Sequence, residues 1–242
     1  MTQIAEIKFD KFASRIFQRE VIVLAIKEHG DALARELPAI LAEYRKRTPV
    51  LICAKVPTEK INTVTLLEAA GFRVIDTNIV LKKPVEKGKA LNGNCEIRFA
   101  TEHDAGGVRA IAGSEFQYSR FHLDPGVSDK LADQFKEEWA GNFFSGQRGD
   151  RMVVAEINDQ LAGFLQLLHD GNKLIIDLMA VASAFRRQSV GADMIIYAED
   201  QAKQFDSVQV GTQVGNVPAL RFYEKLGFRT VGSSYVLHYH NG

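Results

Sequence analysis

The sequence predicts an α/β protein with a mixed sheet, made of a smaller N-terminal part and a larger C-terminal part. Stretches with strand-like and helix-like spacing alternate along the 242 residues. Residues 84–94, PVEKGKALNGN, combine Pro, Gly, Lys and Asn without periodicity, which is typical of a linker. A segment before this linker also resembles one near the C-terminus. We therefore expect an N-terminal α/β domain at 1–85 and a second domain at 94–242.

The composition argues against several classes of protein. Hydrophobic residues make up 46% of the chain, and its 30 basic residues balance its 30 acidic ones. A net charge of zero argues against a nucleic-acid partner, because such proteins present a basic face. No apolar stretch reaches the roughly 20 residues of a membrane span, no signal peptide is visible, and Cys53 and Cys95 lack metal-ligand spacing. We expect a cytoplasmic protein without a metal ion or a membrane partner; a monomer and a homodimer both remain open.

The first part reads as alternating helices and strands. Residues 31–47 have apolar positions at helical spacing and end in cations, which suit a helix C-terminus. Residues 50–54 form an apolar run typical of a buried strand. A helix should follow, with Thr58 as its N-cap and Gly71 just past its end, and residues 73–83 alternate like a strand.

The second part continues the alternation with more strands. Thr101 and Ser128 are N-cap candidates, and Gly227 follows the last helical pattern. We predict helices at 101–116, 128–144, 189–205 and 218–226. We predict strands at 96–100, 151–157, 161–169, 173–181 and 208–214, and then two short strands at the C-terminus.

The chain contains one internal similarity. Residues 66–81, LLEAAGFRVIDTNIVL, align without gaps on residues 222–237, FYEKLGFRTVGSSYVL, with six identities in sixteen positions. The match fits either a degenerate repeat or the shared geometry of a helix–Gly–Phe–strand unit. The first copy has Leu67 where the second has Tyr223, and no arginine-rich turn precedes it. If the parts are related, only the second is expected to keep a ligand site.

Residues 185–195, FRRQSVGADMI, place two arginines and a turn of small residues before a helix. The first N–H groups of a helix lack intrahelical acceptors, and the helix dipole favours an anion there. Such a segment fits a pyrophosphate site, with a solvated basic helix start as the alternative. The residues expected to bind the phosphates are Arg186, Arg187, Gln188, Ser189, Val190, Gly191 and Ala192.

The order strand, Arg-x-x-Ser-x-Gly-Ala, helix, strand, Asn216 and PALRFYEKLGF resembles the Gcn5-related N-acetyltransferase (GNAT) superfamily. The resemblance covers 94–242 and departs from the family at Ser189, where Gly is usual. It implies a GNAT acetyltransferase fold for this part, and it allows the N-terminal part to be a degenerate GNAT-like half. It also implies that acetyl-CoA is the cofactor and that the 186–192 segment binds its pyrophosphate.

The same resemblance assigns further roles. It places Asn216 near the thioester, and it implies that backbone N–H groups near Met179 and Val181, on a splayed strand, hold pantetheine and the carbonyl oxygen. Tyr223 occupies the position of the general acid that protonates the departing thiolate. An ordinary core aromatic is the alternative for this residue.

The acceptor amine must lose a proton before it attacks the thioester. Glu115, Tyr118 and His122 lie in SEFQYSRFH, where the GNAT fold shapes its acceptor pocket. We take Glu115 and Glu68 as candidate catalytic bases, and the second requires the two parts to pack together. Asp177 is a further candidate for the pocket, and structural roles remain the alternative for each residue.

A narrower resemblance links QYSRFHLDPGVSDKLADQFKEEWAGNFF and VGTQVGNVPALRFYEKLGF to the dTDP-fucosamine acetyltransferase group. It implies a nucleotide-linked amino sugar as the acceptor. Arg120 suits a substrate phosphate because its guanidinium matches oxyanions, and Gln213 falls within the matched segment. The alternatives are an N-acetyltransferase acting on a protein or amino-acid amine, and a catalytically silent CoA-binding protein.

Overall fold

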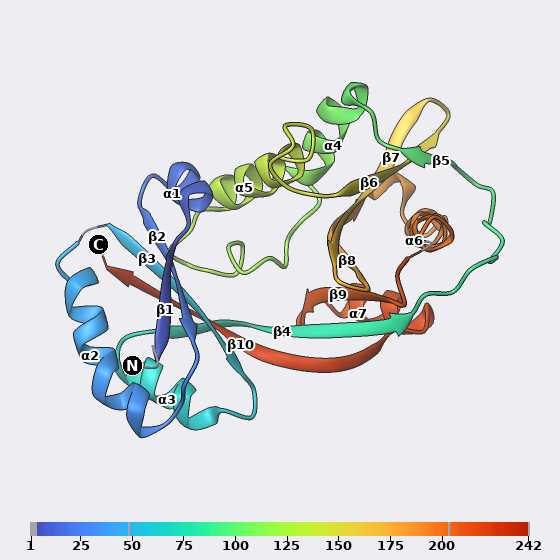
Figure 1. The fold of residues 1–242 in the computed structure, drawn as a ribbon. Helices are drawn as coiled ribbons and strands as arrows, with labels where there is room; N and C mark the ends of the chain where they lie inside the picture. Colours follow the sequence, from blue (N-terminus) through green and yellow to red (C-terminus); the bar gives the residue numbers. More distant parts are fainter. Residues whose placement is uncertain (1–3, 48, 203, 242) are drawn as a thin grey trace.

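The computed structural model describes residues 4–47, 49–202 and 204–241, and these residues form one ten-stranded mixed sheet flanked by helices (Figure 1). The strand order is β1-β2-β3-β10-β4-β9-β8-β7-β6-β5. The strands are β1 (Ala5–Phe9), β2 (Glu20–Ile26), β3 (Val50–Pro57), β4 (Arg73–Pro84), β5 (Glu96–Phe99), β6 (Arg151–Ile157), β7 (Gln160–Asp170), β8 (Lys173–Val181), β9 (Ser207–Gln213) and β10 (Arg229–Asn241). The helices are α1 (Lys11–Phe17), α2 (Asp31–Tyr44), α3 (Ile61–Ala69), α4 (Ala105–Ala112), α5 (Asp129–Gly141), α6 (Val190–Asp200) and α7 (Val217–Lys225).

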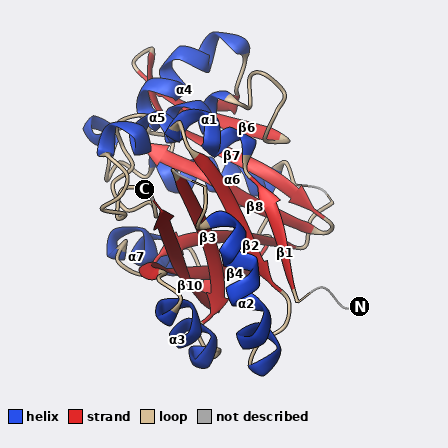
Figure 2. Cartoon of the chain, turned by 90° about the vertical axis from the view of Figure 1, so that its left-hand side faces the viewer, coloured by secondary structure: helices blue, strands red, loops and turns tan. Residues whose placement is uncertain are grey.

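Helices cover both faces of the sheet (Figures 1 and 2). Helices α1, α4 and α5 pack on one face, which we call the α5 face. Helices α2, α3, α6 and α7 pack on the other. Successive side chains of a strand point to opposite faces of the sheet. Leu51 and Cys53 of β3 therefore pack with α1 and α5, whereas Ile52 and Ala54 pack with α2. None of the helices in the described part of the chain is long and apolar enough to cross a membrane.

The two parts of the chain exchange their last strands. Strand β10, from the C-terminal part, pairs with β3, and β4, from the N-terminal part, pairs with β9. Strands β4 and β10 also pair with each other at the centre of the sheet. The fold is therefore α/β with a mixed sheet, as expected, but the sheet is continuous through both parts. The boundaries at 85 and 94 remain a prediction.

The internal similarity corresponds to equivalent structure in the two parts. Residues 66–81 form the end of α3 and most of β4, and residues 222–237 form the end of α7 and most of β10. In both copies the glycine has a positive φ, 105° at Gly71 and 91° at Gly227. The following phenylalanines are both fully buried, and Arg73 and Arg229 each donate to the carbonyl of the phenylalanine before them, at 3.0 and 3.2 Å.

Several predicted boundaries are confirmed and others are wrong: the helices expected to end at 116 and 205 end at Ala112 and Asp200. Ser128 is the N-cap of α5, and Thr101 forms a capping box with Asp104. Thr58 is not a cap: its hydroxyl contacts the Ser233 hydroxyl at 2.6 Å, and α3 begins only at Ile61. The two short C-terminal strands are one 13-residue strand, β10, because a bulge beside Gly232 absorbs the irregularity expected to be a turn.

Candidate active site

A V-shaped gap between two parallel strands forms the centre of the site. Strands β8 and β9 pair from Lys173 opposite Ser207 to Ile176 opposite Val210. Both strands continue past these pairs without pairing with each other. A β-bulge in the β7–β8 pair, between Ile176 and Leu178, lies at the same level. The separation leaves backbone groups of both strands free of each other, so they can bind a ligand between them.

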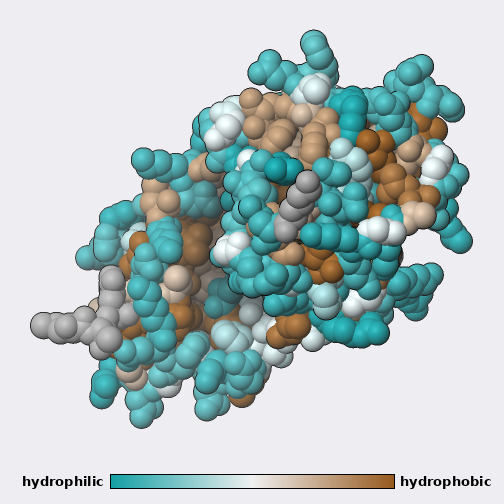
Figure 3. All heavy atoms as spheres, turned by 45° about the vertical axis from the view of Figure 1, so that its right-hand side comes forward, coloured by the Kyte–Doolittle hydropathy of each residue, from teal (hydrophilic) through white to brown (hydrophobic). Residues whose placement is uncertain are grey.

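A cleft of about 960 Å³ follows this gap and runs to the start of α6. The space-filling view shows the surface hollowed between two lobes (Figure 3). The cleft collects most of the residues selected from the sequence, from both strands, the α6 loop and α7. They are Glu115, Tyr118, Asp177, Met179, Val181, Arg186, Arg187, Ser189, Val190, Gly191, Ala192, Gln213, Asn216 and Tyr223.

The loop before α6 has the backbone of an anion site. Arg187 and Ser189 have left-handed φ angles of 64° and 65°, and α6 starts at Val190. Ser189 occupies the N-cap position, but its side chain makes no capping hydrogen bond. Its φ explains why glycine suits this position, since a left-handed φ strains other residues. Space is also tight at Gly191, where a Cβ would lie 3.2 Å from the Phe222 ring and the ring would have to shift slightly.

Arg186 and Glu115 form an ion pair within the cleft. The Glu115 carboxylate also accepts a hydrogen bond from the backbone N–H of Ser183 at 2.9 Å. The Arg186 Nε donates to the carbonyl of Val181 at 3.2 Å. The sequence placed Glu115 among the bases and Arg186 among the phosphate ligands, and the structure brings the two together.

Tyr223 lies on α7, with its ring between Phe222 and Phe228 at centroid distances of 5.1 and 5.3 Å. Its side chain is buried but lines the cleft. Burial raises the pKa of the phenol well above its usual value, so the hydroxyl stays protonated. Asn216 caps α7 by accepting from the N–H of Ala219 at 3.3 Å.

Residues 115–228 match the Acetyltransferase (GNAT) family. This region of the chain, residues 115–228, is a GNAT acetyltransferase domain. A further match is to the spore coat polysaccharide biosynthesis protein SpsD of Bacillus subtilis (strain 168), 31% identical over 137 residues. That match covers 56% of this chain and 47% of the relative, so the chain spans about half of the length of this curated relative.

Solved structures show the same fold over both parts. A functionally unknown conserved protein from Staphylococcus epidermidis superposes with a TM-score of 0.72 at 14% identity, over 100% of this chain and 93% of that one. A tandem GNAT protein from the clavulanic acid biosynthesis pathway gives a TM-score of 0.61 at 12% identity, over 92% and 75% of the two chains. At these identities the likeness concerns the fold alone.

Two residues that the sequence predicted for the acceptor pocket, Asp177 and His122, already form hydrogen bonds with other protein groups. Asp177 accepts from the Trp139 indole at 2.9 Å, the Gln166 amide at 2.9 Å and two nitrogens of Arg148 at 2.7 and 2.5 Å. The His122 ring contacts the Ser119 hydroxyl at 2.6 Å and the Asp133 carboxylate at 3.0 Å. These contacts engage both carboxylate oxygens of Asp177 and both ring nitrogens of His122.

Glu68, Gln188, Arg120 and His122 are predicted residues that do not line the cleft. Glu68 is exposed on α3, on the opposite face of the sheet from the 113–128 loop. Arg120 lies on that loop, with its guanidinium 4.6 Å from the Phe121 ring. The exposed side chain of Gln188 folds back to donate to the Ala184 carbonyl at 3.3 Å.

Lys136, which was not predicted from the sequence as a site residue, lines the cleft from α5. Its ammonium lies 4.8 Å from the Phe116 ring and 5.4 Å from the Trp139 ring. Burial, and then the Arg120 guanidinium, lower the pKa of Lys136 to about 8. Its spacing from Ala132 and Trp139 could have revealed it, because these positions share the inward face of the helix.

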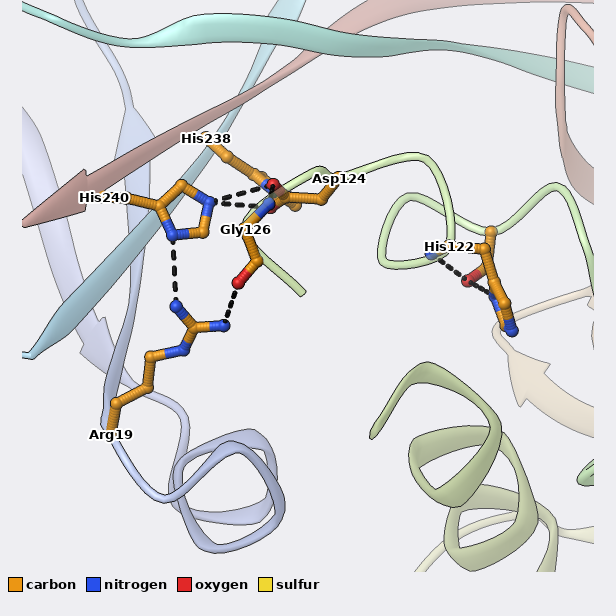
Figure 4. A network of polar contacts seen from close by, with 7 residues as sticks. Arg19, His122, Asp124, Gly126, His238 and His240 are labelled. Atoms are coloured by element: carbon orange, nitrogen blue, oxygen red, sulfur yellow. Dashed lines mark hydrogen bonds and ion pairs between the residues drawn. The ribbon is translucent and has the colours of Figure 1, made fainter. Parts of the chain in front are cut away.

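A buried network ties the 113–128 loop to the end of β10 (Figure 4). The Asp124 carboxylate accepts from His238 Nδ1 at 2.5 Å, from His240 Nε2 at 2.8 Å and from the N–H of Gly126 at 2.8 Å. Arg19 donates to His240 Nδ1 at 3.1 Å and to the Gly126 carbonyl at 2.8 Å. These partners fix the histidine tautomers, and they lower the pKa of Asp124 despite its burial.

The side chains of Asp124, His238 and His240 could offer ligands to a metal ion, since their donor atoms lie within 4.8 Å of one another. The Arg19 guanidinium against His240 disfavours a second cation there. The contacts of 2.5–3.0 Å between these atoms are those of hydrogen bonds. We therefore interpret the network as a structural link between the two parts of the chain.

Proposed function

We propose that this protein transfers the acetyl group of acetyl-CoA to a primary amine of a small molecule. The observation that carries the proposal is the V-shaped gap between β8 and β9, together with the cleft that the start of α6 and Tyr223 line beside it. This one cleft offers a site for phosphates, a narrow passage between strands and a proton donor.

The residues present fit acetyl-CoA. The free N–H groups at the start of α6 and the guanidiniums of Arg186 and Arg187 would hold the pyrophosphate. Backbone groups of β8 near Met179 and Val181 would hold the pantetheine arm and the carbonyl oxygen. Preorganised donors of this kind are worth about 3 kcal/mol each in acyl transfer. The cofactor supplies an activated acetyl thioester.

Tyr223 would donate its proton to the departing thiolate. The raised pKa of the phenol keeps the proton in place across the working pH range. It also makes the phenol a weaker acid than usual, so its contribution depends on holding the donor beside the sulfur. The Phe222 and Phe228 rings on either side hold the tyrosine in this orientation.

We propose an amino sugar, linked to a nucleotide, as the acceptor. The relative with 31% identity is described as a polysaccharide biosynthesis protein, which fits an acceptor of the sugar class. The residues that match the GNAT family, 115–228, include Tyr118, Arg120 and Gln213, which the resemblance assigned to the acceptor. Since Asp177 and His122 are engaged with protein partners, we expect them to shape the pocket and not to remove the amine proton.

A panel of amines tests the function. Free thiol release from acetyl-CoA would be followed with amino sugars, their nucleotide-linked forms, amino acids and peptides. Amine-dependent release that is abolished by the Arg186→Ala, Arg187→Ala double substitution supports the proposal. Thiol release with peptides alone would favour a protein acceptor. Tight CoA binding without transfer to any amine would indicate a silent CoA-binding protein.

Binding measurements test the location of the cofactor. Removing both arginines should weaken CoA by about 10- to 100-fold, the range for charge-assisted contacts, and should leave pantetheine unchanged. Equal losses for both ligands would contradict a pyrophosphate site at 186–192. One CoA per chain is expected, because the N-terminal part has no arginine turn before α3 and no equivalent of Tyr223.

A further inference from the structure

Three cations approach one another on the α5 face of the sheet, beside the cleft. Lys136 projects from α5, Arg120 from the 113–128 loop and Lys55 from β3 of the N-terminal part. Lys55 shares its face of β3 with Cys53, which packs against Phe121. The Arg120 guanidinium lies over the Phe121 ring. The ring centroid of Phe121 is 4.7 Å from that of Phe135, which precedes Lys136 on α5. These contacts bring residues from both parts of the chain to one place.

Two other cations of this region are each paired with an acid. Arg148 is paired with Asp177, and Arg186 with Glu115. Among residues 4–47, 49–202 and 204–241, Lys55, Arg120 and Lys136 form no ion pair. Aromatic rings shield Arg120 and Lys136 partly from water, and this strengthens the repulsion between these two, whereas Lys55 is exposed.

The nearby acids do not balance this charge. Asp177 already neutralises Arg148. Asp76 lies in the same row of paired residues as Lys55, with Val236 between them. Its side chain is buried with one oxygen unpartnered, and burial raises its pKa. The Arg120 guanidinium, in turn, contributes to lowering the pKa of both lysines. A partly desolvated, unbalanced positive charge is costly unless an anion joins it.

We propose that Lys55, Arg120 and Lys136 form a subsite for an anionic group of the acceptor, a phosphate or pyrophosphate, built jointly by the two parts of the chain. This proposal rests on the proposed function, since it assigns the part of the acceptor that does not react. Arg120 offers a planar fork to two phosphate oxygens, and the two lysines add mobile point charges. The N-terminal part thereby supplies a specificity residue, Lys55, to a reaction carried out in the GNAT domain.

Calorimetry with the protein saturated by CoA tests the subsite, because CoA occupies the α6 loop. The probes are uridine diphosphate, malonate as a carboxylate anion, and uridine as the uncharged control. We expect uridine diphosphate to bind, and Lys55→Ala, Arg120→Ala and Lys136→Ala each to weaken it by about 10- to 100-fold. Two exposed lysines serve as controls. Lys130→Ala lies on α5, like Lys136, and Lys46→Ala lies in the N-terminal part, like Lys55.

The outcomes separate the subsite from the proposed function. Equal affinity in all variants, or no binding of the diphosphate, would overturn the subsite, whereas acetyl transfer could still proceed. Malonate binding that exceeds diphosphate binding would also contradict a phosphate site. Loss of diphosphate affinity on Arg186→Ala alone would place the probe on the α6 loop instead. If a variant unfolds, Arg120→Lys and Lys136→Gln replace it, and thermal melting confirms that each variant is folded.

Discussion

The carboxylate of Glu115 holds both the Arg186 guanidinium and the N–H of Ser183, so the first arginine of the proposed pyrophosphate loop is bound to a proposed base. The pair is partly exposed, with 52% of the Arg186 side chain accessible, so its net strength is small. If CoA binds here as proposed, we expect its phosphates to displace Glu115 from Arg186.

Glu115→Gln should tighten CoA binding two- to fivefold, because it frees Arg186 while an amide oxygen can still accept from Ser183. If Glu115 only positions Arg186, turnover with saturating substrates should change little. Calorimetry with CoA and steady-state kinetics measure both effects. A fall in kcat of about a hundredfold or more would return Glu115 to the role of general base.

Ser189→Gly should stabilise the protein by about 1 kcal/mol, because glycine adopts a φ of 65° without strain. The melting temperature should rise by about 2–4 °C for a chain of this size. CoA affinity should stay the same or improve. Ser183→Gly is the matched control: this serine has no positive φ, so glycine there should give no gain. A drop in CoA affinity on Ser189→Gly would show that the hydroxyl binds phosphate.

Tyr223→Phe should lower the rate of the chemical step by about 10²–10⁴-fold, the range for a lost general acid. CoA affinity should hardly change, because the ring contacts with Phe222 and Phe228 survive. Single-turnover measurements avoid masking by slow product release. Phe222→Leu controls for packing. Unimpaired single-turnover chemistry in the phenylalanine variant would remove Tyr223 from the mechanism.

Binding of uridine diphosphate should weaken as the pH rises from 7 to 9, because Lys136 loses its proton near its pKa of about 8. Arg120 and Arg148 also face this ammonium and stay charged, and Asp177 opposes them. Lys136→Arg should abolish the pH dependence, since a guanidinium keeps its charge throughout the range. An unchanged pH profile in that variant would mean that another group titrates.

Asp124→Ala should lower the free energy of unfolding by about 2–4 kcal/mol, since it leaves buried imidazole N–H groups without an acceptor. The pKa of Asp124 is lowered in the folded protein, so its contribution is present above the unfolded value near 4 and is lost as the pH falls below it. Asp129→Ala, at an exposed position of α5, is the control.

Chelators should leave the melting temperature unchanged, and a clear drop would reveal a metal ion.

The sequence predicted most of the GNAT domain because its signals are local. Gly227 ends α7, and the α6 loop follows β8, where the motif placed it. It could not reveal pairings between distant residues. The residues around Thr58 do not indicate that its hydroxyl contacts that of Ser233. Those around Glu115 do not indicate that it forms an ion pair with Arg186. The role of Lys136 likewise depends on Arg120 and on aromatic rings that only the fold brings together.

The crossing of β4 and β10 at the centre of the sheet limits how the chain can be divided. A fragment that starts at residue 94 would lack β4, and the edge of β9 would lose its whole partner strand. The reciprocal fragment would leave β3 without β10. Neither fragment would be a complete folding unit, so heat or denaturant should unfold both parts in a single transition. An insertion that lengthens the 84–94 linker should be tolerated, because the two parts are joined by the sheet itself and not only by this segment.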